Sequence, residues 1–331
     1  MGYVSVIGKY ERYAAPSYRY GLKLIWFCLT CLLCPAALDA QQIRKQPNTS
    51  PLESMSEEFT ATTSLQDWKQ FHTTEGYESK IKRMDVANGV LQLQPFASGW
   101  YADYQAPFLF KTVEGDFDVE VKIKVSGLTD SLPKSEWSLA GLMVREAKKT
   151  TVADWQPRTE NWLFLTTGIA QPKVSPVFEV KTTNNSVSNL KLRPAKAGWV
   201  YLRVVRVQAS FILMYRYENE TWTVLERFYR PLLPESLQVG LNAYSGWNDV
   251  PREIQQDAAI FNKTVLPDVA TDMLVQVDYV HFRRPKINGE KLKEIGQPGF
   301  RAPFYSPGNL LSDYSVSNEQ VLAIIGNSIT K

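Results

Sequence analysis

The sequence predicts an all-β protein, an antiparallel two-sheet β-sandwich of the jelly-roll type with a short C-terminal helical tail. Residues 199–228 give the first observation, because Leu202 and Val204 alternate with polar residues such as Arg203. A period of two is typical of strands with one buried and one solvated face. The polar break at 208–210 fits a hairpin connection. The remaining chain repeats this pattern with few helical periods.

Strand-like segments follow one another from the end of a polar linker at 41–58 to Pro285, so the expected sandwich spans 59–285. Asn88-Gly89 marks a turn before an alternating strand. This density of strands favours a sandwich over an α/β fold. The expected strands are 88–95, 117–125, 138–145, 161–167, 174–182, 199–207, 210–217, 221–228, 237–243, 258–265 and 273–283.

The tail, residues 286–331, begins with a stretch rich in Gly, Pro, Lys and Ser and then carries a short helix. Ser317 is placed to be the N-cap, Gln320 occupies the capping-box position, and Gly326 follows the apolar run as a C-cap. We expect this tail to dock on the sandwich. Docking on a protein partner is the alternative.

The first 40 residues have the features of a signal peptide. The apolar run that begins at Leu24 is too short for a membrane span, which needs about 20 apolar residues. We expect cleavage before Gln41 and export to the periplasm, the cell surface or the extracellular space, with no membrane span left in the mature chain. An uncleaved anchor is the alternative. Four basic residues precede the run, namely Lys9, Arg12, Arg19 and Lys23.

The composition of the mature chain limits its chemistry. All three cysteines, Cys28, Cys31 and Cys34, lie in the expected signal peptide, so disulfides, thiol nucleophiles and cysteine-based zinc sites are not expected. Without the four basic and two acidic residues of that segment, the charge is 33 − 32 = +1, from totals of 37 and 34. The charges do not cluster, which argues against nucleic-acid binding and against a polybasic membrane surface.

Four segments resemble the concanavalin A-like lectin/glucanase superfamily, with its laminin G-like jelly roll, and in particular a poorly characterised bacterial branch of unknown function. The resemblance covers residues 56 to 285 and implies the sandwich fold. The superfamily includes lectins, glycosidases, lyases and interaction modules, so the resemblance alone does not select a function. The matching segments are WVYLRVVR (199–206) with TW (221–222), GDFDVEVKIKV (115–125), AGLMVRE (140–146) and MLVQVDYVHFRRP (273–285).

The acidic string Asp116, Asp118 and Glu120 is the candidate for catalysis, because alternation places its carboxylates on one face of a strand. It resembles the E-x-D-x-E strand of laminarinase-type glycosidases, where such carboxylates act as nucleophile and general acid. The match departs at its first residue, Asp instead of Glu, and in the preceding segment. Lys122 and Lys124 continue the same face, which favours a solvated strand with Val119, Val121 and Ile123 inside.

Aromatic residues in turn-like contexts are the candidates for carbohydrate binding. An aromatic ring stacks on the apolar face of a sugar, while neighbouring amides and carboxylates bind its hydroxyls. The alternative is that these rings close the ends of the sandwich. The candidates are Trp100 with Tyr101 and Tyr104, then Trp155, and Trp247 with Tyr244, Asn248 and Asp249.

The polar face of the sheet is a second candidate surface. Glu120, Arg145, Trp162, Glu179 and Arg203 share one face if their strands are neighbours. The resemblance implies that such a face binds glycans, and Arg145 belongs to the matching AGLMVRE segment. A ladder of cross-strand ion pairs, each worth about 0.2–1 kcal/mol, is the alternative.

We therefore expect an exported, non-catalytic carbohydrate-binding domain. A polysaccharide-active glycoside hydrolase or lyase and a structural or protein-interaction module are the alternatives. The two histidines, His72 and His281, are far apart, which argues against a zinc site or a catalytic triad. No cofactor or metal site is expected, although oxygen ligands for structural calcium are common in such chains.

Overall fold

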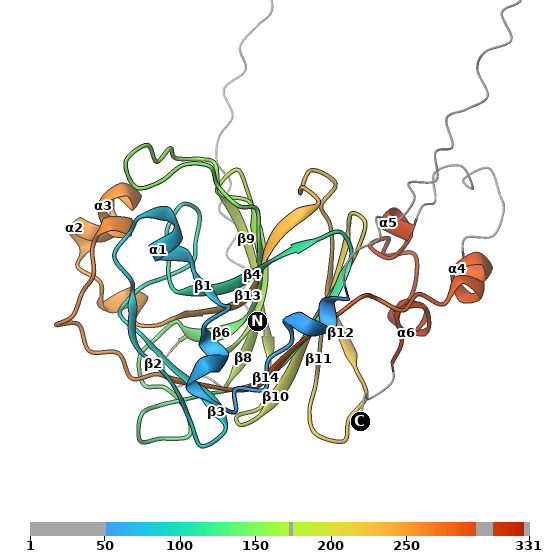
Figure 1. Cartoon of the computed structure of the whole chain (residues 1–331), viewed down its shortest axis with the longest axis horizontal. Coiled ribbons are helices and arrows are strands. Elements are labelled where there is room, and N and C mark those ends of the chain that lie inside the picture. Colours follow the sequence, from blue (N-terminus) through green and yellow to red (C-terminus); the bar gives the residue numbers. More distant parts are fainter. Residues whose placement is uncertain (1–50, 172–174, 296–306, 328–331) are drawn as a thin grey trace, which may run out of the picture. The chain divides into compact units, whose positions relative to one another are not determined.

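Two antiparallel sheets of seven strands each form the described part of the chain, which confirms the predicted fold class (Figure 1). The computed structural model describes residues 51–171, 175–295 and 307–327. The expected signal peptide and the first part of the expected linker, residues 1–50, lie outside the described residues. Sheet A has the order β12 (Thr223–Tyr229), β11 (Ser210–Arg216), β10 (Val200–Val207), β5 (Phe117–Ser126), β14 (Leu274–Arg283), β3 (Val90–Pro95) and β2 (Ile81–Ala87).

Sheet B faces sheet A and is also antiparallel throughout its described pairings. Its order is β1 (Lys69–Gln70), β4 (Phe108–Glu114), β13 (Ser236–Tyr244), β6 (Ser138–Arg145), β7 (Trp162–Ile169), β8 (Val177–Asn184) and β9 (Val187–Pro194). The described helices are short. They are α1 (Phe71–Glu75), α2 (Arg252–Gln255), α3 (Ala258–Lys263), α4 (Gly289–Ile295), α5 (Pro307–Leu310) and α6 (Asn318–Ile325), with 3-10 turns η1 (Leu52–Met55), η2 (Thr62–Leu65) and η3 (Trp247–Asp249).

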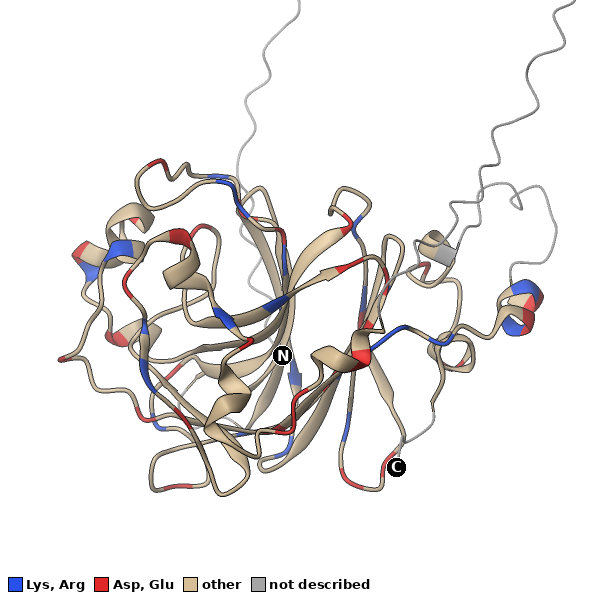
Figure 2. Ribbon diagram, in the orientation of Figure 1, with Lys and Arg blue, Asp and Glu red and all other residues tan. Residues whose placement is uncertain are grey.

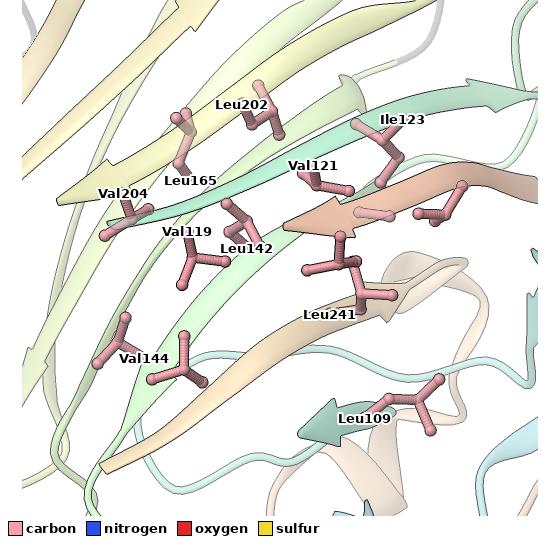
Figure 3. Close-up of a cluster of buried hydrophobic side chains, with 14 of the residues drawn as sticks. Leu109, Val119, Val121, Ile123, Leu142, Val144, Leu165, Leu202, Val204 and Leu241 are labelled. Carbon is pink, nitrogen blue, oxygen red and sulfur yellow. The ribbon is translucent and has the colours of Figure 1, made fainter. Parts of the chain in front are cut away.

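The main core lies between the two sheets and follows directly from the alternation in the sequence (Figure 3). Val119, Val121 and Ile123 point inward from β5, as predicted, and are fully buried. They belong to one cluster with Leu142 and Leu165 of the opposite sheet. Each such side chain contributes about 1.5–3 kcal/mol by its removal from water.

The outer face of sheet B is covered by a second, mainly aromatic cluster that includes Phe71 of α1 and Trp100 of the loop before β4. Figure 1 shows α1, α2 and α3 on this side of the sandwich. The outer face of sheet A is covered by the C-terminal segment, whose Leu311, Val321 and Ile324 are fully buried in a third cluster.

The C-terminal helix forms where it was expected. Ser317 is the N-cap of α6, and the reciprocal bonds of its capping box join Gln320 N to Ser317 Oγ at 3.2 Å and Ser317 N to Gln320 Oε1 at 2.9 Å. Gly326 is the C-cap with φ +84°. The helix packs on strands of sheet A, so the tail docks on its own sandwich in this structure.

The segment 258–265, which was predicted as a strand, is largely helix α3, and this prediction is wrong. The carboxylate of Asp257 accepts hydrogen bonds from Ala259 N at 2.8 Å and from Ile260 N at 3.2 Å. An N-cap of this kind satisfies backbone donors that would otherwise have no partner, so it starts a helix.

Residues 51–58 of the expected linker are also folded onto the sandwich. Leu52 is 5% exposed, and Glu57 pairs with Val280 of β14. Ser56 Oγ accepts a hydrogen bond from Phe282 N at 2.9 Å. Residues 51–58 of the expected linker therefore pack on the sandwich ahead of the expected boundary at residue 59.

Candidate functional site

The residues that were expected on one polar face lie on the outer faces of two different sheets. Arg145, Trp162 and Glu179 belong to β6, β7 and β8 of sheet B, whereas Glu120 and Arg203 are paired on β5 and β10 of sheet A. The expectation that all five share a face is wrong, because alternation gives the direction of a side chain but not the sheet that carries it.

Arg145 is fully buried and is the centre of an ion network on the outer face of sheet B. Its guanidinium donates to Glu160 through Nε at 2.9 Å and Nη2 at 2.7 Å, and Nη1 donates to Glu75 at 2.6 Å and Gln238 at 3.0 Å. The guanidinium also lies 4.4 Å from the centroid of the Phe71 ring. The Arg145 guanidinium is thus fully engaged by groups of the chain itself.

The two carboxyl groups of this network have pKa values that move in opposite directions. Burial raises the pKa of Glu75, and Arg145 only partly offsets this effect. Burial acts in the same way on Glu160, but the bidentate contact with Arg145 outweighs it and lowers the pKa. A pair with divided pKa values is typical of acid–base sites. Both carboxylates are almost completely buried, so a substrate cannot reach them in this structure.

Glu179 is also engaged on this face. Its Oε1 lies 2.7 Å from Lys181 Nζ, and Tyr244 donates its hydroxyl hydrogen bond to Oε2. Burial and the adjacent carboxylate raise the pKa of Tyr244 well above its usual value. Lys181 also donates to the carbonyl of Trp100 at 2.8 Å, which ties the covering loop to the sheet.

The acidic string of β5 forms ion pairs beneath the C-terminal tail. Asp118 is 2% exposed and accepts from Arg203 at 2.8 and 2.7 Å and from Arg283 at 2.9 Å. Glu120 accepts from Tyr279 at 2.7 Å and from Arg283 at 3.2 Å. Because donors already occupy their oxygens, neither carboxylate is presented to a sugar.

Asp116 lies just before β5 and does not join these ion pairs. It accepts a hydrogen bond from Gln208 N at 2.6 Å, and burial raises its pKa. Asp118 and Glu120 therefore share Arg283 as a partner, whereas Asp116 is held by the backbone of Gln208. The solvated strand face that was the alternative explanation is wrong at Asp118 and Glu120, because both are buried.

The aromatic candidates divide into buried and accessible residues. Trp100 and Tyr244 are 1% and 2% exposed and belong to the cluster over sheet B. Trp247 is half-buried, and its ring centroid lies 5.0 Å from that of Tyr104 and 5.3 Å from that of Phe261. Gly99 makes room for it, since a Cβ there would lie 2.6 Å from the Trp247 ring. Trp100 and Tyr244 thus lie over sheet B, whereas Trp247 packs in a separate small cluster with Tyr104 and Phe261.

Two further candidates, Asn248 and Asp249, are exposed in η3 beside Trp247, and Asn248 donates to the carboxylate of Glu136. Trp155 is half-buried in the loop between β6 and β7. These residues stay accessible at their edges. Among the described residues, none of these three side chains contacts Arg145, Trp162 or Glu179 of the sheet face.

Tyr101 differs from the other aromatic candidates because its side chain is 47% exposed. It lies in a junction of three loops, residues 101–104, 158–161 and 185–188, which we call the Tyr101 junction. The carboxylate of Asp103 accepts from Arg158 N at 3.0 and 3.1 Å and from the hydroxyl of Ser186. Ser188 Oγ accepts from Ala102 N at 2.8 Å. The loop that carries Tyr101 is thus fixed to the β8–β9 hairpin.

The backbone of this junction is strained at four points. Non-glycine residues with positive φ cost about 1–3 kcal/mol each and tend to cluster at functional sites. The four residues are Ala102 (φ 51°), Arg158 (φ 62°), Asn185 (φ 43°) and Ser186 (φ 63°). The guanidinium of exposed Arg158 forms no hydrogen bond or ion pair with the described residues, so it is available to a ligand.

Sequence reasoning found Tyr101 but missed Asp103, Arg158 and Ser186. Their roles depend on contacts between loops that are far apart in the chain. The one local signal was the Asn-Asn-Ser turn at 184–186, which favours left-handed backbone.

Neither a metal cluster nor a spanning helix is found in the part of the chain that the structure describes. There, no group of three or more His, Cys, Asp or Glu side chains could hold a metal ion. Figure 2 shows that basic and acidic residues are interspersed along the described part of the chain. None of the described helices has the length and apolar character that crossing a membrane requires.

No family model matches the sequence, and no curated protein matches it. Solved structures do match. A functionally unknown protein from Saccharomyces cerevisiae is 14% identical, with a TM-score of 0.47, over 67% of this chain and 98% of that one. The GH43 protein BlXynB from Bacillus licheniformis is 13% identical, with a TM-score of 0.46, over 69% of this chain and 39% of that one.

A third match is SCLam, a non-specific endo-β-1,3(4)-glucanase from family GH16, at 14% identity and a TM-score of 0.42, over 69% of this chain and 89% of that one. Two of these three matches are thus named as glycoside hydrolases. At these identities and scores we carry no residue role from them to this chain. The bacterial branch of unknown function that the sequence resembles stays a prediction.

Proposed function

We propose that this chain is a non-catalytic carbohydrate-binding protein and that a sugar ring stacks on Tyr101. The observation that carries the proposal is the exposed tyrosine, 47% accessible, on a loop fixed by the Asp103 contacts. A tyrosine ring offers an apolar face to the C–H bonds of a sugar, and a fixed loop reduces the entropy lost on binding.

Polar side chains of the Tyr101 junction support the same ligand class. The Arg158 guanidinium has five donors for sugar hydroxyls, and the Asn185 side chain offers further donors and acceptors. Asn185 is exposed; its backbone N–H donates to Asn161 Oδ1 at 2.9 Å, whereas its side-chain Oδ1 has only a long contact, 3.5 Å, with Asn161 Nδ2. Lys181 lies 5.7 Å from the Tyr101 centroid. Its ammonium is engaged by Glu179 and the Trp100 carbonyl, so we assign it to loop support instead of ligand binding.

The test is binding of neutral plant, algal and bacterial polysaccharides to the chain from Gln41 onward, followed by titration with an oligosaccharide of the best binder. We expect Tyr101→Ala to weaken binding about three- to tenfold, the range for one lost aromatic contact. Tyr229→Ala is the matched control, because Tyr229 is 51% exposed on the edge strand β12 of the other sheet. Equal binding by both variants would remove Tyr101 from the site.

A glycoside hydrolase or lyase is the competing proposal, and two of the matched structures are named as glycoside hydrolases. It needs two carboxyl groups that face one sugar. Release of reducing sugar by the wild-type chain, lost in Glu120→Gln, would favour it. A structural or protein-interaction module is the third possibility. It gains weight if no polysaccharide binds, because Trp100 and Trp162 are buried.

A further inference from the structure

An open cleft of about 560 Å³ lies at one end of sheet A, apart from the Tyr101 junction on sheet B. Lys124 of β5 and Leu274 of β14 line its base. One wall is the loop 127–131 that follows β5, and the other is the turn Ala197-Gly198 that precedes β10. The C-terminal helix packs on other residues of sheet A, toward Asp118 and Arg203.

The loop wall is held in place by Asp272, just before β14. Its Oδ1 accepts from Leu128 N at 2.8 Å and its Oδ2 accepts from Lys134 N at 2.8 Å. A Cβ on Gly127 would lie 2.8 Å from the carbonyl oxygen of Leu132, so the loop needs glycine for this close approach. The wall is therefore organised before any ligand arrives, which lowers the entropy cost of binding.

Lys124 gives the cleft its charge. It alternates with the buried Ile123 and Val125, so its side chain lies on the outer face and is half-buried. Its β14 neighbour in the register is uncharged Gln276. Within the described residues, its ammonium has no hydrogen bond or ion pair. A partly desolvated cation without a counter-ion binds an anion favourably.

The other charged groups near the cleft already have partners, and the Asp272 carboxylate accepts the two backbone hydrogen bonds of the loop wall. Lys122, two residues earlier on the same face, lies 2.7 Å from Asp278. Asp130 in the loop wall lies 2.6 Å from Lys134. These pairs leave the Lys124 ammonium as the one uncompensated charge among the described lining residues. Leu128, 51% exposed, together with Leu274 supplies an apolar surface beside it.

We infer that this cleft is a second saccharide site and that it binds a sugar unit with an anionic group, a carboxylate or a sulfate ester, at Lys124. The anion pairs with the ammonium, and the apolar face of the ring contacts Leu128. The choice of a sugar rests on the proposed carbohydrate binding, whereas the choice of an anion rests on Lys124 alone. The two sites lie on different sheets and are testable separately.

The experiment is calorimetric titration of the chain from Gln41 onward with three probes: a trigalacturonate, a sulfated galactan oligosaccharide and a neutral galactan oligosaccharide. We expect at least one anionic probe to bind, and Lys124→Gln to weaken it about tenfold, the value of one charge-assisted contact. Lys82→Gln is the matched control, since Lys82 is an exposed lysine on β2. Its affinity for the anionic probes should stay at the wild-type level.

Which anionic probe binds decides between carboxylate and sulfate. The inference is overturned if neither binds at up to about 10 mM, or if Lys124→Gln binds both as tightly as the wild type. It is also overturned if Lys124→Gln weakens the neutral probe equally, because the charge would then not be the cause. Binding of an anionic probe without any neutral-glycan binding would refute the Tyr101 proposal and leave this one standing.

Discussion

The outer faces of the two sheets both bury charged residues, but they are covered in different ways. Sheet B is covered by loops and short helices that lie within the sandwich sequence, such as α1 and the loop with Trp100. Sheet A is covered by a segment that follows the last strand, where Arg203 donates to the carbonyls of Ile325 at 3.1 Å and Gly326 at 2.9 Å. Alternating polar residues in a strand therefore do not establish a solvated face.

The ion networks under the two covers differ in how they tolerate the loss of one arginine. On sheet B, Arg145 is the central partner of both Glu75 and Glu160. On sheet A, Asp118 forms ion pairs with both Arg203 and Arg283. If one arginine is removed, the other still compensates the charge of the carboxylate. Redundant partners limit the penalty of a broken ion pair, because the remaining charge stays compensated.

The largest effect that we expect follows from this difference. Arg145→Met should lower the free energy of unfolding by about 3–5 kcal/mol, since it leaves two buried carboxylates without their guanidinium. Arg203→Met should cost about 1.5–3 kcal/mol, the value of a hydrogen bond to a charged group. Urea unfolding of both variants measures the two values. Equal losses would contradict the argument from redundancy.

Helix α6 covers part of the outer face of sheet A and is expected to stabilise the chain. Ile324→Ala removes a fully buried side chain of α6 and should lower the stability of the chain by about 2–5 kcal/mol, toward the low end if the helix can shift to fill the space. Leu322→Ala is the control on the same helix, because Leu322 is only partly buried. Urea unfolding followed by fluorescence reports both. An effect at Leu322 as large as at Ile324 would mean that the helix packs differently.

Much of the fold could be predicted because it depends on local pattern. Inward residues such as Val119 and Leu202 and the capping box of Ser317 require only neighbouring sequence. Strand β9 was missed because it is an edge strand whose residues are exposed or only half-buried, so that Leu190 and Leu192 are its only signal of alternation. Helix α3 was assigned as a strand because its apolar run is short and the cap at Asp257 was overlooked.

The candidate site could be predicted only in part, for a physical reason. Whether an aromatic ring or a carboxylate is accessible depends on segments that pack over it from elsewhere in the chain. Trp100 and Tyr101 are adjacent in the sequence, yet one is 1% exposed and the other 47%. Arg145 was singled out as a ligand-binding residue, but α1 supplies Glu75 from a distance of 70 residues and closes the face.

The cover of sheet B also contains a histidine that makes stability depend on pH. His72 of α1 is 2% exposed, and its pKa is lowered well below 6.5 by burial first and then by the positive charges of Lys80 and Arg145. The folded protein thus holds this imidazole neutral at pH values where the unfolded chain has bound a proton. The unfolded state binds more protons in that window, so stability falls as the pH decreases below 6.5.

We expect this residue to add a slope of up to about 1.4 kcal/mol per pH unit to the free energy of unfolding, below pH 6.5 and down to the pKa of the folded state. His72→Gln should remove that slope, although it lowers stability at neutral pH because Gln does not reproduce the contact between the Phe71 and imidazole rings, whose centroids lie 5.0 Å apart. The comparison of slopes, and not of absolute stabilities, is therefore the diagnostic measurement. Urea unfolding of both proteins at several pH values between 5 and 7 gives the two slopes. Parallel slopes for the wild type and His72→Gln would contradict the prediction. They would mean that water and protons reach His72 beneath α1 more freely than its burial indicates.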